Sequence, residues 1–224
     1  MQEMKSVGKG NTAEVFEYGN ETVCKLFFEG YPHDYVALEF QNAREMYKTS
    51  IRIPKPFQMI AIGNREGIIY ERITGNTLFN VMAENTADWD KYLNVFVNLQ
   101  LDIMAHHTLN VLSYKEYLIA ALKNRKINNE TIFHTIHTLP DDDCLLHGDF
   151  HPNNILVMPN GTPVIIDFMN VCHGPALYDV ARTYVLIKEY DGCLADKYLE
   201  KTDVLENEII EYLKIIEFCR QYES

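Results

Sequence analysis

The sequence predicts an α+β fold in which a small β-rich part, residues 1–75, precedes a mainly helical part, residues 76–224. The first observation is a change in hydrophobic spacing near Gly75, from the alternation typical of strands to the three- and four-residue spacing typical of helices. The second is size. A chain of 224 residues that is 47% hydrophobic holds one large domain or two small lobes, with a core that needs no disulfides.

Three short apolar runs in the N-terminal part are typical of strands: residues 13–18, 22–28 and 67–73. Between the second and third runs, residues 35–49 carry apolar side chains at helical spacing. The sequence Ile53-Pro54-Lys55-Pro56 then prevents the helix from continuing, because proline lacks the backbone N–H that a helix requires. The N-terminal part is therefore predicted to be one helix among strands, with a boundary near Gly75.

The C-terminal part is predicted to be helical with one β interruption. Helices are expected over residues 89–104, after a capping box at Ser113-Tyr114-Lys115-Glu116, over residues 177–190, and from residue 203 onwards. The interruption consists of two apolar runs, residues 155–158 and 163–166. Because Pro159-Asn160-Gly161-Thr162 separates these runs and Asn-Gly favours a tight turn, they are predicted to form a hairpin.

Charge and cysteine content exclude several classes of protein. The net charge is −12, so a nucleic acid, which needs a basic patch, is a poor partner. Residues 76–224 carry 22 acidic against 11 basic groups, which favours a cationic ligand or simply solvated helix faces. The five scattered cysteines indicate reduced thiols and a cytoplasmic location. The start of the chain and its apolar runs indicate neither a signal peptide nor a membrane span.

The densest group of polar residues lies just before the predicted hairpin, in His147-Gly148-Asp149-Phe150-His151-Pro152-Asn153-Asn154. Asp167 follows at the end of the hairpin, so the hairpin is expected to fold it back beside this loop. The oxygen atoms of Asp149, Asn154 and Asp167 are ligands that Mg²⁺ prefers, together with substrate phosphates. Asp149 and Asn154 are five residues apart, as in phosphoryl-transfer loops where the aspartate orients a hydroxyl and the asparagine holds a metal ion.

These motifs resemble those of the aminoglycoside phosphotransferase and choline kinase family of small-molecule phosphotransferases. The resemblance rests on HGDFHPNNIL, VIIDF and GPALYDVAR, in that order and spacing. Protein kinases place Arg where Gly148 stands, and Asp167-Phe168-Met169 departs from their Asp-Phe-Gly. The resemblance implies a bilobal protein-kinase-like fold with an N-lobe, a C-lobe and a catalytic hairpin between helices.

The resemblance also implies roles for individual residues. Asp149 would orient the acceptor hydroxyl, Asn154 and Asp167 would hold Mg²⁺, and His147 and Asp179 would brace the catalytic loop. The nucleotide would be held by Lys25 paired with Glu39, preferred over Glu45, by the Gly8 to Val15 loop with Gly8 and Gly10, and by backbone groups of the segment containing Glu71 and Ile73.

We therefore expect an enzyme, an ATP-dependent small-molecule kinase, that transfers the γ-phosphate of ATP or GTP to a hydroxyl group. The acceptor is expected to be a small and cationic alcohol such as an aminoglycoside, choline or an amino sugar, with no nucleic-acid or membrane partner. One alternative is a catalytically inactive nucleotide-binding module, and another is a metal-dependent hydrolase that uses His147, Asp149 and His151. A protein kinase is disfavoured because residues 167–177 are too few for an extended activation segment.

Overall fold

The computed structural model describes residues 5–222, and their contacts divide the chain into two compact units. The first unit comprises the residues up to Leu78 together with Ile155–Met169, and the second comprises Phe79–Asn154 and the residues from Asn170 onwards. The sequence prediction divided the chain once, near Gly75. The units differ from that division because the hairpin that begins at Ile155 pairs with a strand of the first unit.

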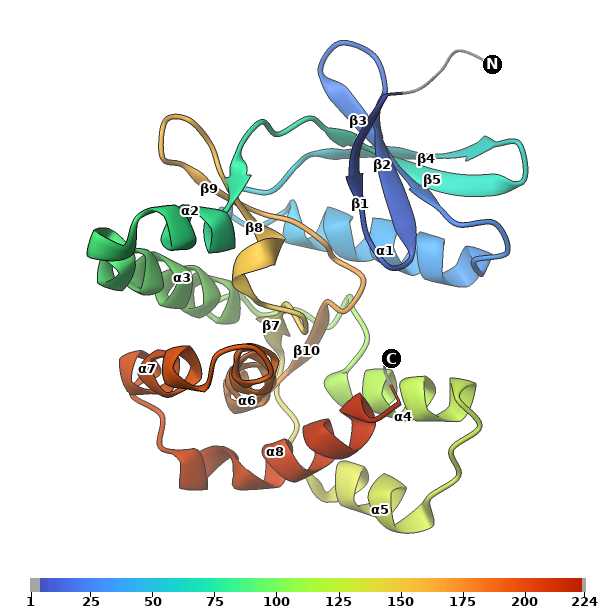
Figure 1. Ribbon diagram of the computed structural model, residues 1–224. Helices are drawn as coiled ribbons and strands as arrows, with labels where there is room; N and C mark the ends of the chain where they lie inside the picture. Colours follow the sequence, from blue (N-terminus) through green and yellow to red (C-terminus); the bar gives the residue numbers. More distant parts are fainter. Residues whose placement is uncertain (1–4, 223–224) are drawn as a thin grey trace. The chain divides into compact units, whose positions relative to one another are not determined.

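Five antiparallel strands form one sheet in the first unit, in the order β1-β2-β3-β5-β4 (Figure 1). Their bounds are β1 Ser6–Lys9, β2 Ala13–Glu17, β3 Thr22–Phe27, β4 Pro56–Ile62 and β5 Arg65–Glu71. Helix α1 (His33–Met46) packs against β4 and β5. The three predicted runs correspond to β2, β3 and β5, and the predicted helix corresponds to α1.

The two-residue period of β3 decides which of its side chains enter the core. Cys24 and Leu26 are buried in an apolar cluster with Ile69 of β5. Lys25 lies between them and therefore points to the opposite face of the sheet. That face is the one covered by α1, since Lys25 contacts Glu39 of this helix.

Two strands of the sheet were not predicted. β4 begins at Pro56. In the sequence, this proline indicated only that the preceding helix ends before it. Because β4 is an edge strand, its proline need not remove a hydrogen bond of the sheet. β1 lies in the glycine-bearing N-terminal segment and forms a hairpin with β2.

A three-stranded sheet completes the first unit. β6 (Asn76–Thr77) pairs with β8 (Ile155–Val157), and β8 pairs with β9 (Pro163–Ile165), so the predicted hairpin is confirmed. Gly161 in its turn has φ +83°, a conformation that favours glycine. Before β6, a Cβ atom on Gly75 would lie 2.4 Å from a carbonyl oxygen of β8, so the two segments can approach this closely only with glycine at this position.

The second unit is mainly helical (Figure 1). Its helices are α2 Leu78–Glu84, which begins at the last residue of the first unit, the 3-10 turn η1 Thr86–Asp88, α3 Trp89–Met104, α4 Tyr114–Asn124, α5 Glu130–Thr138, η2 Pro152–Asn154, α6 Ala176–Lys188, α7 Gly192–Thr202 and α8 Glu206–Arg220. Two short strands, β7 (Cys144–Leu146) and β10 (Cys172–Gly174), pair antiparallel.

The predicted final helix differs in its start and has a separate helix before it. α8 begins at Glu206 rather than at residue 203. Asp203 has the left-handed φ of 56° at the C-cap of α7 and so ends that helix. At the other end of α7, the Asp191 side chain accepts a hydrogen bond from the Leu194 N–H. α7 is therefore delimited by local capping groups, which the spacing of apolar residues does not reveal.

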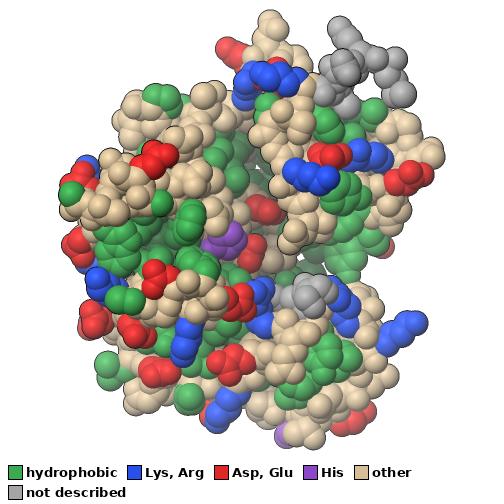
Figure 2. Space-filling model, in the orientation of Figure 1, with side chains coloured by type: hydrophobic (Ala, Val, Ile, Leu, Met, Phe, Trp, Pro, Cys, Tyr) green, Lys and Arg blue, Asp and Glu red, His purple; other side chains and the backbone are tan. Residues whose placement is uncertain are grey.

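Acidic and basic side chains are interspersed over the visible face of the molecule (Figure 2). The excess of acidic groups in residues 76–224 therefore does not form one continuous acidic surface on this face. Among the described residues, every helix is too short or too polar to cross a membrane.

The capping box at the start of α4 should contribute measurably to stability. The Ser113 hydroxyl accepts a hydrogen bond from the Glu116 N–H at 3.1 Å, and the Glu116 carboxylate accepts one from the Ser113 N–H at 2.9 Å. Ser113→Ala removes the hydroxyl acceptor, so we expect the free energy of unfolding in urea to fall by about 1 kcal/mol. Ser113→Thr keeps the acceptor and is the control. Equal stability of the two variants would contradict a role for the cap.

Candidate active site

Three charged side chains of the first unit meet at the amino group of Lys25. Its Nζ lies 2.7 and 2.9 Å from the two carboxylate oxygens of Glu39 on α1, and 2.9 Å from Oδ1 of Asp167, after β9. Glu39 is buried, with 1% of its side chain exposed, and Lys25 is 16% exposed. The structure thus pairs Lys25 with Glu39, the residue preferred from the sequence, whereas Glu45 pairs with Lys48.

The two carboxylates keep Lys25 protonated. Burial alone would lower the pKa of Lys25, but the charges and hydrogen bonds of Glu39 and Asp167 raise this pKa above its usual value. Tyr70 at the end of β5 adds a further contact, because its hydroxyl donates to a Glu39 oxygen at 3.3 Å. Glu39 and Asp167 therefore hold the charged amino group of Lys25 in a fixed position.

The backbone around Asp167 is held in a strained conformation by neighbouring side chains. Asp167 has φ +68°, in the left-handed region that non-glycine residues rarely adopt. Asn42 on α1 donates from Nδ2 to the Phe168 carbonyl at 3.0 Å, and the buried Phe168 ring lies 6.3 Å from the Tyr70 ring. Asn42 was not identified from the sequence, although it follows Glu39 by three residues on the same helix face.

The hairpin formed by β1 and β2 contains Gly8 and Gly10, and its own packing leaves room for a side chain at both positions. The Gly10 N–H donates to the Ala13 carbonyl at 2.9 Å, which closes the turn. A Cβ atom on Gly8 or Gly10 would meet only ordinary contacts, at 3.7 and 3.8 Å. Neither glycine is therefore required by the packing of the hairpin itself.

The segment predicted to hold the base of a nucleotide begins at the end of β5. The Glu71 N–H donates to the Lys55 carbonyl at 2.9 Å, so this N–H is not available to a ligand. The Glu71 side chain pairs with Arg52, and hydrogen bonding to Arg52 lowers the pKa of Glu71. Ile73 follows in an extended segment outside regular secondary structure.

The second group of candidate residues lies in the loop after β7, within the second unit. The Asn154 Nδ2 donates to the Asp149 carbonyl at 2.9 Å and to its carboxylate Oδ2 at 3.2 Å. The Asp149 N–H donates in turn to Nδ1 of His147, which is fully buried. Since its amide N–H groups bind Asp149, Asn154 has its amide oxygen left to approach a cation.

Asp149 is strongly acidic. Burial by itself would raise the pKa of Asp149, but the neighbouring His151 and the positive charge of Arg182 lower it to about 2. The carboxylate is therefore ionised at neutral pH and is a weak proton acceptor. It can accept a hydrogen bond from a hydroxyl group and orient it, without taking its proton in advance.

Two side chains of α6 form hydrogen bonds with the backbone of Gly148. The Gly148 N–H donates to Oδ1 of Asp179 at 2.8 Å, and its carbonyl accepts from Nε of Arg182. Gly148 has φ +73°, and a Cβ atom there would lie 2.1 Å from the Asn170 carbonyl oxygen. The Asp179 carboxylate therefore contacts the loop that it is expected to brace. Arg182 was not identified from the sequence, although it belongs to the quoted GPALYDVAR motif.

A buried network of hydrogen bonds holds the Asp179 carboxylate in place. Gln100 on α3 donates from Nε2 to the second Asp179 oxygen and to the Thr183 hydroxyl, both at 2.9 Å. The Tyr198 hydroxyl on α7 donates to the side-chain amide oxygen Oε1 of Gln100 at 2.5 Å. α3 thus contacts the Asp179 carboxylate directly, and α7 is linked to it through Gln100. A lone glutamine in an apolar helix gives no sequence signal for such a role.

The alternative metal site of a hydrolase is not formed. Nδ1 of His147 is occupied by the Asp149 N–H, and its ring packs edge-on against Phe150 at 5.7 Å. Within residues 5–222, His147, Asp149 and His151 do not bring three ligand atoms together; the cluster that does lies elsewhere. The meeting of Asp149 and Asn154 with Asp167 at one magnesium ion stays a prediction.

Comparison with known proteins identifies the family. The model of the phosphotransferase enzyme family matches residues 3–206. A search of curated protein sequences finds no match. Among solved structures, the apo form of a thermostable mutant of aminoglycoside phosphotransferase APH(4)-Ia has a TM-score of 0.72 at 16% identity, over 100% of this chain and 87% of the other.

Two further structures show the same fold. The ternary complex of an APH(4)-Ia mutant with AMP-PNP and hygromycin B has a TM-score of 0.70 at 17% identity, over 100% of this chain and 86% of the other. An aminoglycoside-3'-phosphotransferase of type VIII has a TM-score of 0.69 at 14% identity, over 96% and 93%. The fold is therefore that of the kinase-like aminoglycoside phosphotransferases, and the chain belongs to the phosphotransferase enzyme family.

Proposed function

We propose that this protein transfers the γ-phosphate of ATP or GTP to a hydroxyl group of a small molecule. The observation that carries the proposal is the ion pair of Lys25 with Glu39 and Asp167, inside a member of the phosphotransferase family. A partly buried lysine that two carboxylates keep charged is suited to binding the α- and β-phosphates of a nucleotide. The AMP-PNP in the similar APH(4)-Ia complex supports a nucleoside triphosphate as co-substrate.

The β1–β2 hairpin would cover the phosphates. Because Gly8 and Gly10 are not required by packing within the hairpin, their small size is available for a close approach of backbone N–H groups to phosphate oxygens. The Glu71 carbonyl and the backbone of Ile73 would bind the edge of the base. These contacts would position the nucleotide, and positioning with charge neutralisation accounts for most of the catalysis in phosphoryl transfer.

Asp149 would act on the acceptor. A carboxylate with a pKa of about 2 accepts a hydrogen bond from the attacking hydroxyl and holds it in line with the γ-phosphate. The hydrogen bond from Asn154 to Asp149 and the hydrogen bond that holds Gly148 to Asp179 would fix the direction of this carboxylate.

The donor set fits Mg²⁺. Asp167 would supply a carboxylate, which is 42% exposed, and Asn154 would supply an amide oxygen; magnesium typically takes one or two such protein ligands together with substrate phosphates. When bound, the ion would neutralise charge on the phosphate oxygens. Lys25, already beside Asp167, would share that task.

A cationic acceptor is the substrate class that the charge balance favours, with amino sugars, aminoglycosides and choline as examples. The support is the excess of acidic groups in residues 76–224. A transfer assay with labelled ATP and GTP over a panel of hydroxyl-bearing cations, each matched with a neutral alcohol, tests the function and the acceptor class together. Tight nucleotide binding without transfer to any member would favour the inactive nucleotide-binding module instead.

Loss of the Asp149 carboxylate should separate catalysis from binding. Asp149→Asn keeps the shape of the side chain but removes its charge, so turnover should fall by about 10²–10⁴-fold. The affinity for the nucleotide, measured by calorimetry, should change little because the proposed nucleotide contacts come from other residues. Wild-type turnover in this variant would refute the assigned role.

Asp167→Asn should have the opposite signature. It removes a magnesium ligand and one carboxylate partner of Lys25, so we expect the dissociation constant for the magnesium–nucleotide complex to rise by at least about tenfold. Binding of the nucleotide in the presence of EDTA should change less than binding in the presence of magnesium. Equal losses under both conditions would argue against metal binding by Asp167.

The buried network should matter for the catalytic loop. Gln100→Leu leaves the Asp179 carboxylate without its buried amide partner, at a cost of roughly 1–3 kcal/mol in stability. Because the loop would be held less firmly, kcat should fall more than the nucleotide affinity. Asn98→Leu, an exposed amide on the same helix, is the control. A lower melting temperature with unchanged kcat at a permissive temperature would limit the network to a purely structural role.

A further inference from the structure

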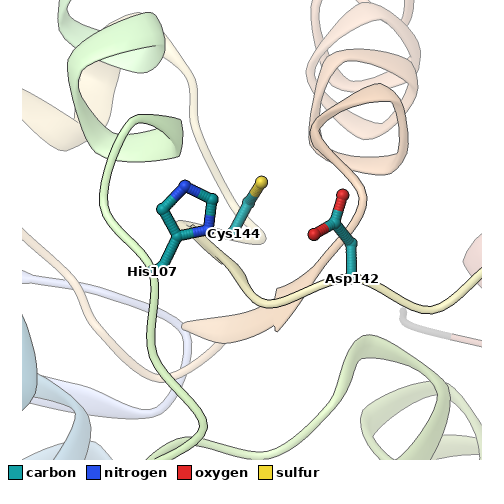
Figure 3. A group of neighbouring side chains, drawn as sticks. All are labelled: His107, Asp142 and Cys144. Atoms are coloured by element: carbon teal, nitrogen blue, oxygen red, sulfur yellow. The ribbon is translucent and has the colours of Figure 1, made fainter.

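A second cluster of reactive side chains lies outside the candidate active site. His107 follows α3, Asp142 precedes β7, and Cys144 is the first residue of β7. One ligand atom from each lies within 4.8 Å of the other two. Figure 3 shows the three side chains beside one another, His107 on one segment and Asp142 and Cys144 on a second.

The backbone holds the segments that carry these side chains. His107 and Cys144 form an antiparallel bridge, flanked by a bond from the Leu145 N–H to the His106 carbonyl at 2.7 Å and one from the Thr108 N–H to the Asp143 carbonyl at 2.8 Å. Cys144 also pairs with a residue of β10. His107 and Cys144 are therefore positioned by paired backbone segments, and Asp142 lies two residues before Cys144 in the chain.

The donor atoms select one class of ion. Imidazole nitrogen, thiolate sulfur and carboxylate oxygen together suit Zn²⁺, whereas Mg²⁺ prefers oxygen ligands alone. A fourth group is close, because Oδ1 of Asp143 lies 2.7 Å from Nδ1 of His107. An ion bound at that nitrogen would have a second carboxylate within reach, which fits the tetrahedral coordination of zinc.

We propose that His107, Asp142 and Cys144 bind a Zn²⁺ ion, with Asp143 available as a fourth ligand. Binding releases the proton of the Cys144 thiol to solvent and involves no change of oxidation state. The ion would tie the segment after α3 to β7, the strand that leads directly into His147. The site is independent of the proposed phosphotransferase reaction and would act by stabilising this part of the second unit.

The test is zinc binding by the full chain after treatment with a chelator. The protein is titrated with Zn²⁺ against a chromophoric chelator, in excess Mg²⁺ to occupy the candidate active site. One equivalent should bind to the wild type, and its affinity should fall at least about tenfold in Asp142→Asn and His107→Asn. Cobalt should give a thiolate-to-metal absorption band that Cys144→Ser lacks.

Two control variants match the histidine and the cysteine of the cluster. His106→Asn alters the neighbouring histidine, whose Nδ1 contacts the Asp102 carbonyl, and Cys193→Ser removes an exposed free thiol on α7. Both should bind zinc as the wild type does. Asp142 is exposed, so its variant should fold even if the Cys144 variant does not. The proposal would be overturned if the wild type bound no equivalent of Zn²⁺, or if Asp142→Asn and His107→Asn bound Zn²⁺ with the affinity of the wild type.

Discussion

The ammonium group of Lys25 joins three segments of the first unit that are far apart in the sequence. It contacts Glu39 on α1 and Asp167 after β9 from its position on β3. Removing one partner from a buried ion pair leaves an uncompensated charge and typically costs about 3–5 kcal/mol. The strand, the helix and the returning hairpin therefore depend on one another through a single cation, and the strained backbone of Asp167 is kept in place within that arrangement.

In the second unit, a buried anion rather than a cation joins separate segments. The buried Asp179 carboxylate accepts bonds from Gly148 and Gln100, while Arg182 from the next turn of α6 binds the Gly148 carbonyl. The loop backbone is thus held by α6, and α6 is held by α3 through Gln100. Because Arg182, together with His151, also lowers the pKa of Asp149, a side chain that holds the loop also helps to keep ionised the residue proposed to orient the acceptor.

Local sequence signals accounted for much of the architecture and for the identity of the candidate residues. The alternation in β2, β3 and β5, the capping box of α4 and the Asn-Gly hairpin were all visible, because each depends on residues close together in the chain. The short strands β7 and β10 gave no such signal, since three buried apolar residues, as in β7, are typical of several structures and the Cys-His-Gly of β10 has no strand pattern. They are recognised only by their pairing.

The sequence by itself determined which residue types could carry phosphoryl-transfer chemistry: the His-Gly-Asp loop, the Asn five residues later, and the Asp that ends the hairpin. Only the tertiary structure decided which groups support them. Asn42, Gln100 and Arg182 are ordinary helix residues in the sequence, and they acquire their roles from partners 34 to 126 residues away. The same holds for His107 and Asp142, because a ligand cluster depends on distances in space, which hydrophobic periodicity does not encode.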